Sequence, residues 1–228
     1  MSAVPAPRIV DIGAERLERW VRGFVERHGA VVFAAVGNTL HLTAADGATA
    51  AFDPPFPPLP DNWGSTEPLA TLVAHASRPR FIGVLLVRLG GYAAGAFNGD
   101  ELVATKVGSR QVHGRSSAGG WSQQRFARRR EGQVKIALES AIANAATILL
   151  PLLPRLDAVV TGGDRQALRT VLADDRLAAL QPLVTTRILD VPDPRARILR
   201  DCLPACRAVR VTIDETANPQ RPAPVPSS

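Results

Sequence analysis

The sequence has few of the residues from which redox and metal sites are built. It holds 2 cysteines and 4 histidines in 228 residues, and the histidines are scattered along the chain. Cys202 and Cys206 lie four positions apart on an expected helix, and no second pair of cysteines or histidines completes a zinc spacing. We therefore expect two ordinary buried thiols in a reducing compartment, with no metal and no cofactor.

Membrane and export signals are lacking as well. The N-terminus shows no basic segment followed by an apolar run, and no apolar stretch reaches the ~18 residues that a membrane-spanning helix needs. A hydrophobic content of 46% and a charged content of 21% are typical of a folded soluble protein. These features predict a cytoplasmic protein without a membrane partner.

Lysine is almost absent, and the positive charge is concentrated in one window. Of 27 cationic residues only Lys106 and Lys135 are lysine, and the window that they bound holds eight cations and one acid, Glu131, a balance of +7. Because the whole chain carries +6, the residues outside the window sum to −1. Charge gathered in this way indicates a polyanionic partner.

The first 60 residues predict a small module of one helix and a few strands. Apolar residues recur at helical spacing over Ala14–His28, and short β-rich runs follow at Ala30–Val36, Leu40–Leu42 and Ala48–Phe52, separated by glycine turns. Residues 1–8 are expected to be loose. Asp53–Pro60 holds five prolines and predicts a stiff linker that ends the module.

Residues 61–216 predict a larger α/β domain, followed by a disordered tail over 217–228. Three hairpin-linked strands are expected over Phe81–Arg88, Tyr92–Phe97 and Glu101–Val107, and a long helix over Gln123–Leu149. Strands and helices then alternate, at Leu156–Val160, Asp164–Ala173, Arg187–Val191, Asp193–Cys206 and Val209–Ile213. This order is that of a ribonuclease-H-like fold, a mixed sheet with helices on its faces.

The polar stretch between the third strand and the long helix is the candidate reactive segment. In Gly119-Gly120-Trp121-Ser122-Gln123, the glycines allow close approach of another molecule, and Ser122 is a candidate N-cap. Gln123 would then stand at a helix N-terminus, where an amide can orient a water and free N–H groups can stabilise an oxyanion. The alternative is a glycine hinge and helix cap with an incidental glutamine.

The same residues carry a family resemblance. Val107–Gln133, with its Gly-Ser-Arg opening, its Gly-x-x-Gln core and its arginine-rich helix start, resembles the bacterial Vms-like release factors, relatives of the catalytic domain of eukaryotic-type peptide release factors. The resemblance runs through about residues 70–215 and implies a ribonuclease-H-like domain. It also implies a metal-independent hydrolase that frees nascent peptide from peptidyl-tRNA, with the loop entering the peptidyl-transferase centre of the large ribosomal subunit.

In this resemblance the family glutamine corresponds to Gln123 and its glycine to Gly120, with Gln124 as a neighbouring alternative. Termination factors have a contiguous Gly-Gly-Gln, whereas Trp121 and Ser122 intervene here, so the resemblance favours rescue of stalled ribosomes over reading of stop codons. We expect a monomer whose basic residues contact transfer or ribosomal RNA phosphates. The candidate contacts are Arg110, Arg115, Arg125, Arg128, Arg129, Arg130, His113 and Lys106.

Other functions fit the residues less well. Ser109, His113, Ser116 and Ser117 have no acid in the loop to complete a serine–histidine hydrolase. Thr161-Gly162-Gly163 is expected to be a turn, with Asp164 as the cap of the helix that follows, and it lacks the Lys-Ser/Thr of a P-loop. Phe81–Arg88 holds no carboxylate, which disfavours a two-metal nuclease. A non-catalytic RNA- or ribosome-binding module on the same fold stays open, because it would keep the arginines and have no use for Gln123.

Overall fold

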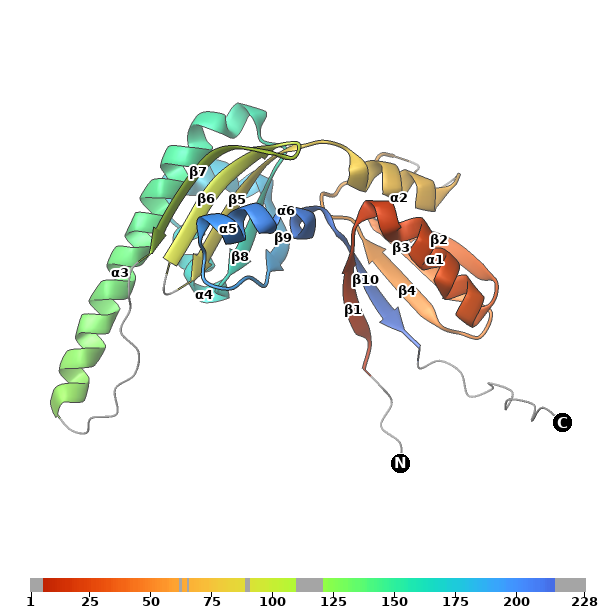
Figure 1. Cartoon of the computed structure of the whole chain (residues 1–228), viewed down its shortest axis with the longest axis horizontal. Coiled ribbons are helices and arrows are strands. Elements are labelled where there is room, and N and C mark those ends of the chain that lie inside the picture. The colour runs from red at the N-terminus through yellow and green to blue at the C-terminus, as the bar shows by residue number, and fades with distance from the viewer. Residues whose placement is uncertain (1–5, 62, 65, 89–90, 110–120, 216–228) are drawn as a thin grey trace. The chain divides into compact units, whose positions relative to one another are not determined.

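The computed structural model describes residues 6–61, 63–64, 66–88, 91–109 and 121–215, and the side chains of 121–131 lie outside that description. The chain forms two compact units. Unit 1 consists of Met1–Arg78 and Arg207–Ser228, and unit 2 consists of Pro79–Cys206. Each unit contains one five-stranded sheet, so the protein is mixed α/β, with six α-helices in the described residues (Figure 1).

Unit 1 is an antiparallel sheet covered on one face by two helices. Its strand order is β1-β10-β4-β3-β2. The strands are β1 (Arg8–Ile12), β2 (Val31–Val36), β3 (Thr39–Ala44), β4 (Thr49–Asp53) and β10 (Val209–Asp214), and the helices are α1 (Ala14–His28) and α2 (Pro68–Ser77). The expected helix and three-strand meander are therefore confirmed by α1 and β2–β4.

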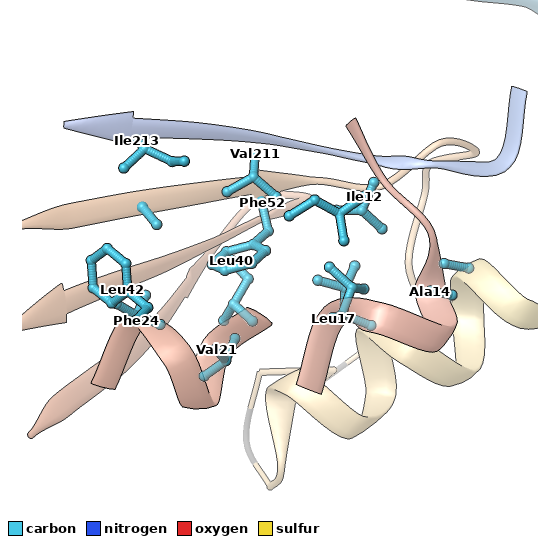
Figure 2. Close-up of a cluster of buried hydrophobic side chains, with 14 of the residues drawn as sticks. Ile12, Ala14, Leu17, Val21, Phe24, Leu40, Leu42, Phe52, Val211 and Ile213 are labelled. Atoms are coloured by element: carbon cyan, nitrogen blue, oxygen red, sulfur yellow. The ribbon is translucent and has the colours of Figure 1, made fainter. Parts of the chain in front are cut away.

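The core of unit 1 explains why these residues form these elements. On α1, Leu17, Val21 and Phe24 recur at three- and four-residue spacing and are buried against alternate residues of the strands, among them Leu40 and Phe52 (Figure 2). Gly29 ends α1 with a φ of 84°, a left-handed conformation that glycine adopts without strain.

The division of the chain differs from the one expected at the proline-rich segment. Strand β10 lies between β1 and β4 and is antiparallel to both, although the sequence places it in the second domain. The segment after the prolines also belongs to unit 1, because Leu59, Trp63 and Leu72 are buried in its core. Strand β1 begins at Arg8, the last residue of the segment expected to be loose, and continues over residues 9–12, where the sequence predicted no strand. The pairing of β1 with β10 joins the two ends of the chain in one sheet, which local patterns do not report.

Unit 2 has a mixed sheet in the order β7-β6-β5-β8-β9. The strands are β5 (Phe81–Arg88), β6 (Gly91–Asn98), β7 (Glu101–Ser109), β8 (Ala158–Gly163) and β9 (Val184–Leu189). Neighbours β5, β6 and β7 are antiparallel, whereas β8 runs parallel to both β5 and β9. The three hairpin-linked strands expected from the sequence are confirmed. The last two strands differ in their bounds from the expected ranges, and the predicted Thr161-Gly162-Gly163 turn is the end of β8.

Helices cover both faces of this sheet. On one face, α3 (Trp121–Leu149) and α4 (Arg165–Leu172) share a core with Leu85 and Val87 of β5. On the other face lies α5 (Ala196–Asp201), where a β-carbon on Gly95 would meet Leu199 at 2.7 Å. The predicted cap of α4 is confirmed, since the Asp164 side chain accepts a hydrogen bond of 2.7 Å from the Ala167 N–H.

Several short elements complete the units and correct the expected boundaries. The 3-10 helices η1 (Leu150–Arg155) and η2 (Asp175–Leu183) precede β8 and β9, and the predicted last helix is divided into α5 and α6 (Leu203–Arg207). Helix α2 begins at Pro68, and its N-cap residue, Glu67, makes no side-chain capping bond.

A carboxylate in the β3–β4 turn of unit 1 gives a pH-dependent prediction. Asp46 accepts a hydrogen bond of 3.0 Å from the Ala48 N–H and lies 2.9 Å from His28 Nδ1. The Ala48 N–H first and His28 second hold the pKa of Asp46 below its usual value. The charged form therefore stabilises the fold at neutral pH, and this contribution is lost as the pH falls through the lowered pKa.

Replacing Asp46 by asparagine is expected to lower the free energy of unfolding at pH 7 by about 0.5 kcal/mol, a small value because the side chain is partly solvated. The difference from the parent protein should vanish in acid, where Asp46 is itself protonated. Urea unfolding at neutral and acidic pH measures both values. Asp61→Asn, at an exposed carboxylate of unit 1, serves as the control, and a deficit of equal size at both pH values would contradict the prediction.

Candidate functional site

The candidate reactive segment joins β7 to α3 in unit 2. Strand β7 ends at Ser109 and helix α3 begins at Trp121. The predicted residues Gly119, Gly120, Arg110, His113 and Arg115 lie between these two elements, outside the residues that the structure describes. Their roles stay predictions.

The backbone of α3 places the predicted glutamine in its first turn. The helix starts at Trp121, so Ser122 is its second residue and not the N-cap that the sequence suggests. Gln123 and Gln124 follow within the same turn. The side chains of these residues, and those of Arg125, Arg128, Arg129 and Arg130, lie outside the described part of the chain. The first four N–H groups of an α-helix have no partner within the helix, and Gln123 is among the residues that supply them.

The length of α3 separates the candidate residues from the core. Its 29 residues span about 43 Å at 1.5 Å per residue. The described residues buried on α3 begin at Ala141 and continue through Ile142, Ala145 and Leu149. Gln123 is therefore about 27 Å along the axis from the first buried residue. Figure 1 shows the N-terminal half of α3 extending beyond the end of the sheet that its C-terminal half covers.

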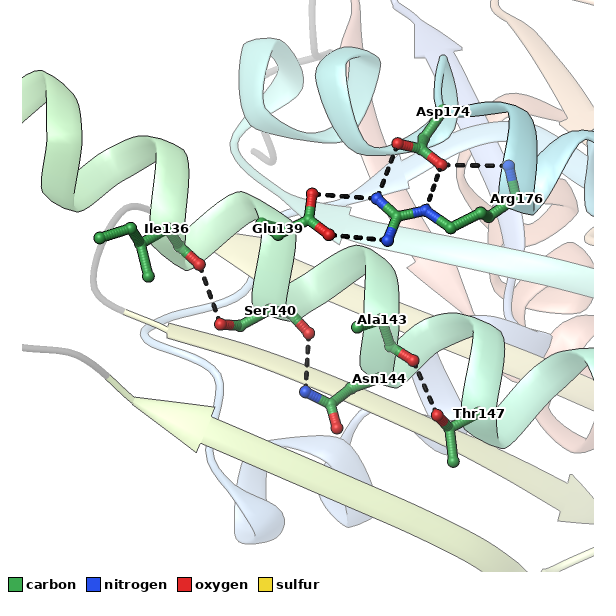
Figure 3. Close-up of polar contacts among 8 residues, drawn as sticks. All are labelled: Ile136, Glu139, Ser140, Ala143, Asn144, Thr147, Asp174 and Arg176. Atoms are coloured by element: carbon green, nitrogen blue, oxygen red, sulfur yellow. Dashed lines mark hydrogen bonds and ion pairs between the residues drawn. The ribbon is translucent and has the colours of Figure 1, made fainter.

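An ionic cluster joins the middle of α3 to η2. The Arg176 guanidinium donates to both oxygens of Glu139 on α3, at 2.7 and 2.9 Å, and to both oxygens of Asp174, at 2.7 and 2.9 Å (Figure 3). This guanidinium lowers the pKa of Asp174 to about 2 and also lowers the pKa of Glu139. Exposed ion pairs add little stability, but a bidentate arginine–carboxylate pair fixes the relative orientation of its two side chains. We infer that this cluster orients α3 where it leaves the core.

A second contact holds α3 against the start of β6. The Asn144 amide donates a hydrogen bond of 2.6 Å to the hydroxyl of Tyr92 on β6, the only tyrosine of the sequence. Gly108 lies opposite Tyr92 in the β6–β7 register, and a β-carbon at Gly108 would overlap the Tyr92 ring. Sequence reasoning missed this contact. The strand expected from the sequence ends at Val107, whereas β7 continues to Ser109 and includes Gly108. A glycine inside a strand often marks close approach, so the longer strand would have been the signal.

Gly108→Ala is expected to lower the free energy of unfolding by about 1–3 kcal/mol, because the added methyl forces the Tyr92 ring away from Asn144. Urea denaturation of the purified chain measures the change. Gly132→Ala on α3 is the matched control: a β-carbon there would meet nothing within 4 Å, and the substitution should raise stability by up to ~1 kcal/mol. Equal stability of the Gly108→Ala variant and the parent would show that Tyr92 can move without cost.

Among the residues predicted to contact RNA, Lys106 has a side chain that the structure describes. Lys106, on β7, is exposed. The formal charge of unit 2 is +7, from 18 cations and 11 acids, whereas unit 1 has 9 cations and 10 acids and carries −1. The positive charge of the chain therefore belongs to the unit that contains β7 and α3.

The part of the chain that the structure describes contains two free cysteines and no metal-binding cluster. Among the residues that the structure describes, no group of three His, Cys, Asp or Glu side chains could hold a metal ion. Cys202 and Cys206 are free and buried, with their Sγ atoms 3.9 Å apart, and the hydrogen bond between them lowers the pKa of Cys202.

One helical segment is apolar enough to resemble a membrane span. Gly132–Arg155, within α3 and η1, is long and apolar enough for a membrane-spanning helix by length and composition alone. The sequence predicted no apolar stretch of that length. Ala141, Ala145 and Leu149 of this segment are buried in the core of unit 2. A helix that packs on the core of a folded domain meets the same criterion, so this finding is weak evidence for a membrane.

The chain resembles several known proteins. Solved structures that match the chain include an archaeal protein (16% identity, TM-score 0.40, 70% of this chain and 48% of that one). Another is the archaeal translation termination factor aRF1 (15% identity, TM-score 0.43, 86% of this chain and 64% of that one). A third is the Vms1 mitochondrial localization core (11% identity, TM-score 0.37, 86% of this chain and 80% of that one). The chain thus spans about half of the first structure and just under two thirds of the second.

Sequence comparison assigns the family. No curated protein matches the chain. The sequence pattern of the release factor family described as actinobacteria/chloroflexi VLRF1 matches residues 80–212, which include β7, the candidate segment and α3. Because this match covers more than half of the 228 residues, the chain belongs to the actinobacteria/chloroflexi VLRF1 release factor family.

Proposed function

We propose that this protein is a peptidyl-tRNA hydrolase that frees nascent peptide from stalled ribosomal complexes through the loop containing Gly119, Gly120, Ser122 and Gln123. The observation that carries the proposal is the release factor family match, which spans the loop and the whole of α3. Membership of such a family supports a release-factor-type role and an interaction with the ribosome. The concentration of positive charge in unit 2 supports binding to RNA.

The proposed chemistry needs neither a metal nor a side-chain nucleophile. The bond to be broken is the ester between the peptide and the tRNA ribose. The Gln123 amide would orient a water molecule toward the ester carbonyl, and unpaired N–H groups at the start of α3 would stabilise the negative charge that develops on the carbonyl oxygen. Gly120 and Gly119 carry no side chain, which allows the loop to approach the ester closely.

The fold of unit 2 suits this role. Its strand order, with three antiparallel strands followed by two parallel ones, and its helices on both faces support the proposed ribonuclease-H-like assignment. The projecting half of α3 would carry the loop into the peptidyl-transferase centre, which lies deep within the large subunit. Arg110, Arg115, Arg125, Arg128, Arg129, Arg130, His113 and Lys106 would contact RNA on the way. In this proposal the protein acts as a cytoplasmic monomer, without a membrane partner or cofactor.

Peptide release from defined complexes tests the proposal. Ribosomes stalled with a radiolabelled peptidyl-tRNA, and large subunits split from them, are mixed with the purified chain, and released peptide is counted. Release by puromycin in a parallel sample shows that each complex is competent. We expect release by the protein from at least one of the two complexes. Binding without release from either would favour the alternative, a non-catalytic ribosome- or RNA-binding module.

A further inference from the structure

A groove on unit 1 has the side chains of a binding site. It lies between α1 and the end of β1 and has a volume of about 360 Å³, within the range of ligand pockets. Trp20 and Ile12 supply apolar surface, and Arg16, Arg19 and Arg27 supply positive charge. One acid, Asp11, also lines the groove and is 3.3 Å from Arg210.

Three arginines at helical spacing line the groove. Arg16, Arg19 and Arg27 lie on the same side of α1 as Gly23. Arg22, three positions from Arg19, does not line the groove. Acids lie four positions from both central arginines, Glu15 before Arg19 and Glu18 and Glu26 on either side of Arg22, so Arg19 and Arg22 have similar surroundings on the helix and differ in whether they line the groove.

The arginines of the groove are accessible to a ligand. Arg16 and Arg19 are exposed, and Arg16 is 3.4 Å from Glu15, in a pair whose side chains are 68% and 75% exposed. Arg27 is 3.2 Å from Glu215, also in an exposed pair. Exposed ion pairs of this kind are worth little, so a phosphate could replace the carboxylates at small cost.

Trp20 and Gly23 give the groove an aromatic wall and an open floor. The Trp20 indole is half-buried, with its ring stacked on Phe24 at 5.4 Å between centroids and edge-on to Phe52 at 5.5 Å. These contacts fix the ring in place. A β-carbon on Gly23 would meet nothing within 4 Å, although glycine within a helix costs roughly 1 kcal/mol relative to alanine. Because Gly23 lines the groove and has no side chain, it leaves this part of the groove open.

We propose that this groove binds a nucleotide of single-stranded RNA, with the base against Trp20 and the phosphates against Arg16 and Arg19. A fixed aromatic ring beside arginines is the combination by which proteins hold unpaired bases without reading their sequence. An acidic peptide would use the arginines but gain little from the indole, so RNA fits the groove better. The identification of this RNA as ribosomal or transfer RNA rests on the proposed function. The proposal that the groove binds single-stranded RNA does not.

A charge reversal at Arg19, matched by one at Arg22, tests this site. Arg19→Glu and Arg22→Glu change the net charge equally and lie three positions apart on one helix. Both are made in a full chain carrying Arg128, Arg129 and Arg130→Ala, to weaken RNA binding by unit 2. Binding of a fluorescein-labelled single-stranded RNA of about 12 nucleotides, within the site size of one binding fold, is measured by anisotropy over a range of salt.

We expect Arg19→Glu to weaken binding by about tenfold and to reduce the salt slope by about 0.7, the value for one phosphate contact on a single strand. Arg22→Glu should weaken it less than twofold. Ultraviolet crosslinking and mass spectrometry should place bound RNA on α1. Equal effects of the two reversals, or crosslinks only outside α1, would overturn the proposal, as would a poly-glutamate peptide that binds the groove more tightly than the RNA.

This result is independent of the release assay. A protein that releases peptide while Arg19→Glu and Arg22→Glu behave alike keeps the proposed function and loses the groove. A protein that fails to release peptide while the two reversals differ keeps the groove and loses the hydrolase.

Discussion

Replacing Gln123 by alanine is expected to reduce the rate of peptide release by roughly 10²–10³-fold, the cost of removing one preorganised polar group from a hydrolytic site. The alanine variant keeps the helix, because alanine has the highest helix propensity. It loses the amide that would hold the attacking water. The single-turnover rate on saturating stalled complexes measures this loss directly, since binding does not limit the rate under those conditions.

Two further measurements separate catalysis from binding. Affinity for the stalled complexes should be unchanged in Gln123→Ala, because the lost amide is uncharged. Gln124→Ala is the matched control, with the same substitution in the same turn of α3, and should release peptide at nearly the parent rate. If the effects of the two variants are reversed, Gln124 is the working residue. If both variants are fully active, a glutamine amide does not carry the chemistry.

Reversing the charges at Arg125, Arg128, Arg129 and Arg130 together is expected to weaken ribosome binding by roughly 100-fold at moderate salt. Each phosphate contact contributes about 0.7–0.9 to the slope of log K against log salt, so the loss of four contacts should reduce that slope by about 3. Equilibrium sedimentation with ribosomes over a salt series measures both quantities. Release at saturating protein should fall far less than binding does, because these residues are proposed to position the loop and not to react.

The control for this variant changes the net charge by the same amount elsewhere on unit 2. Arg165, Arg169, Arg197 and Arg200 are exposed residues of α4 and α5. Reversing these four should alter long-range attraction to the ribosome equally and leave the short-range phosphate contacts intact. If the two fourfold variants bind alike, the arginines of α3 contribute only to the net charge, and the proposed RNA contacts are wrong.

Local patterns predicted the elements whose partners are close in sequence. The spacing of Leu17, Val21 and Phe24 predicted α1, and the hairpin turns between Phe81 and Val107 predicted three consecutive antiparallel strands. Both signals arise within a few residues, because a helix face repeats every three to four positions and a hairpin joins adjacent strands. The capping side chain of Asp164 was predicted for the same reason.

Contacts between distant segments could not be predicted in this way. The prolines before Asp61 suggested a boundary, yet Trp63 and Leu72 beyond them complete the core of unit 1. A strand that joins the other end of the chain has no local signature of its partner.

The sequence by itself determined the concentration of charge between Lys106 and Lys135, the Gly-x-x-Gln segment and its resemblance to release factors. Those features are defined by residue types and by spacings of a few residues. Only the tertiary structure decided that β10 belongs between β1 and β4, that Arg176 fixes α3 to η2, and that Gly108 makes room for Tyr92. Each of these depends on tertiary contacts between residues that are not neighbours in the sequence, and the packing of the whole fold determines which of those contacts form.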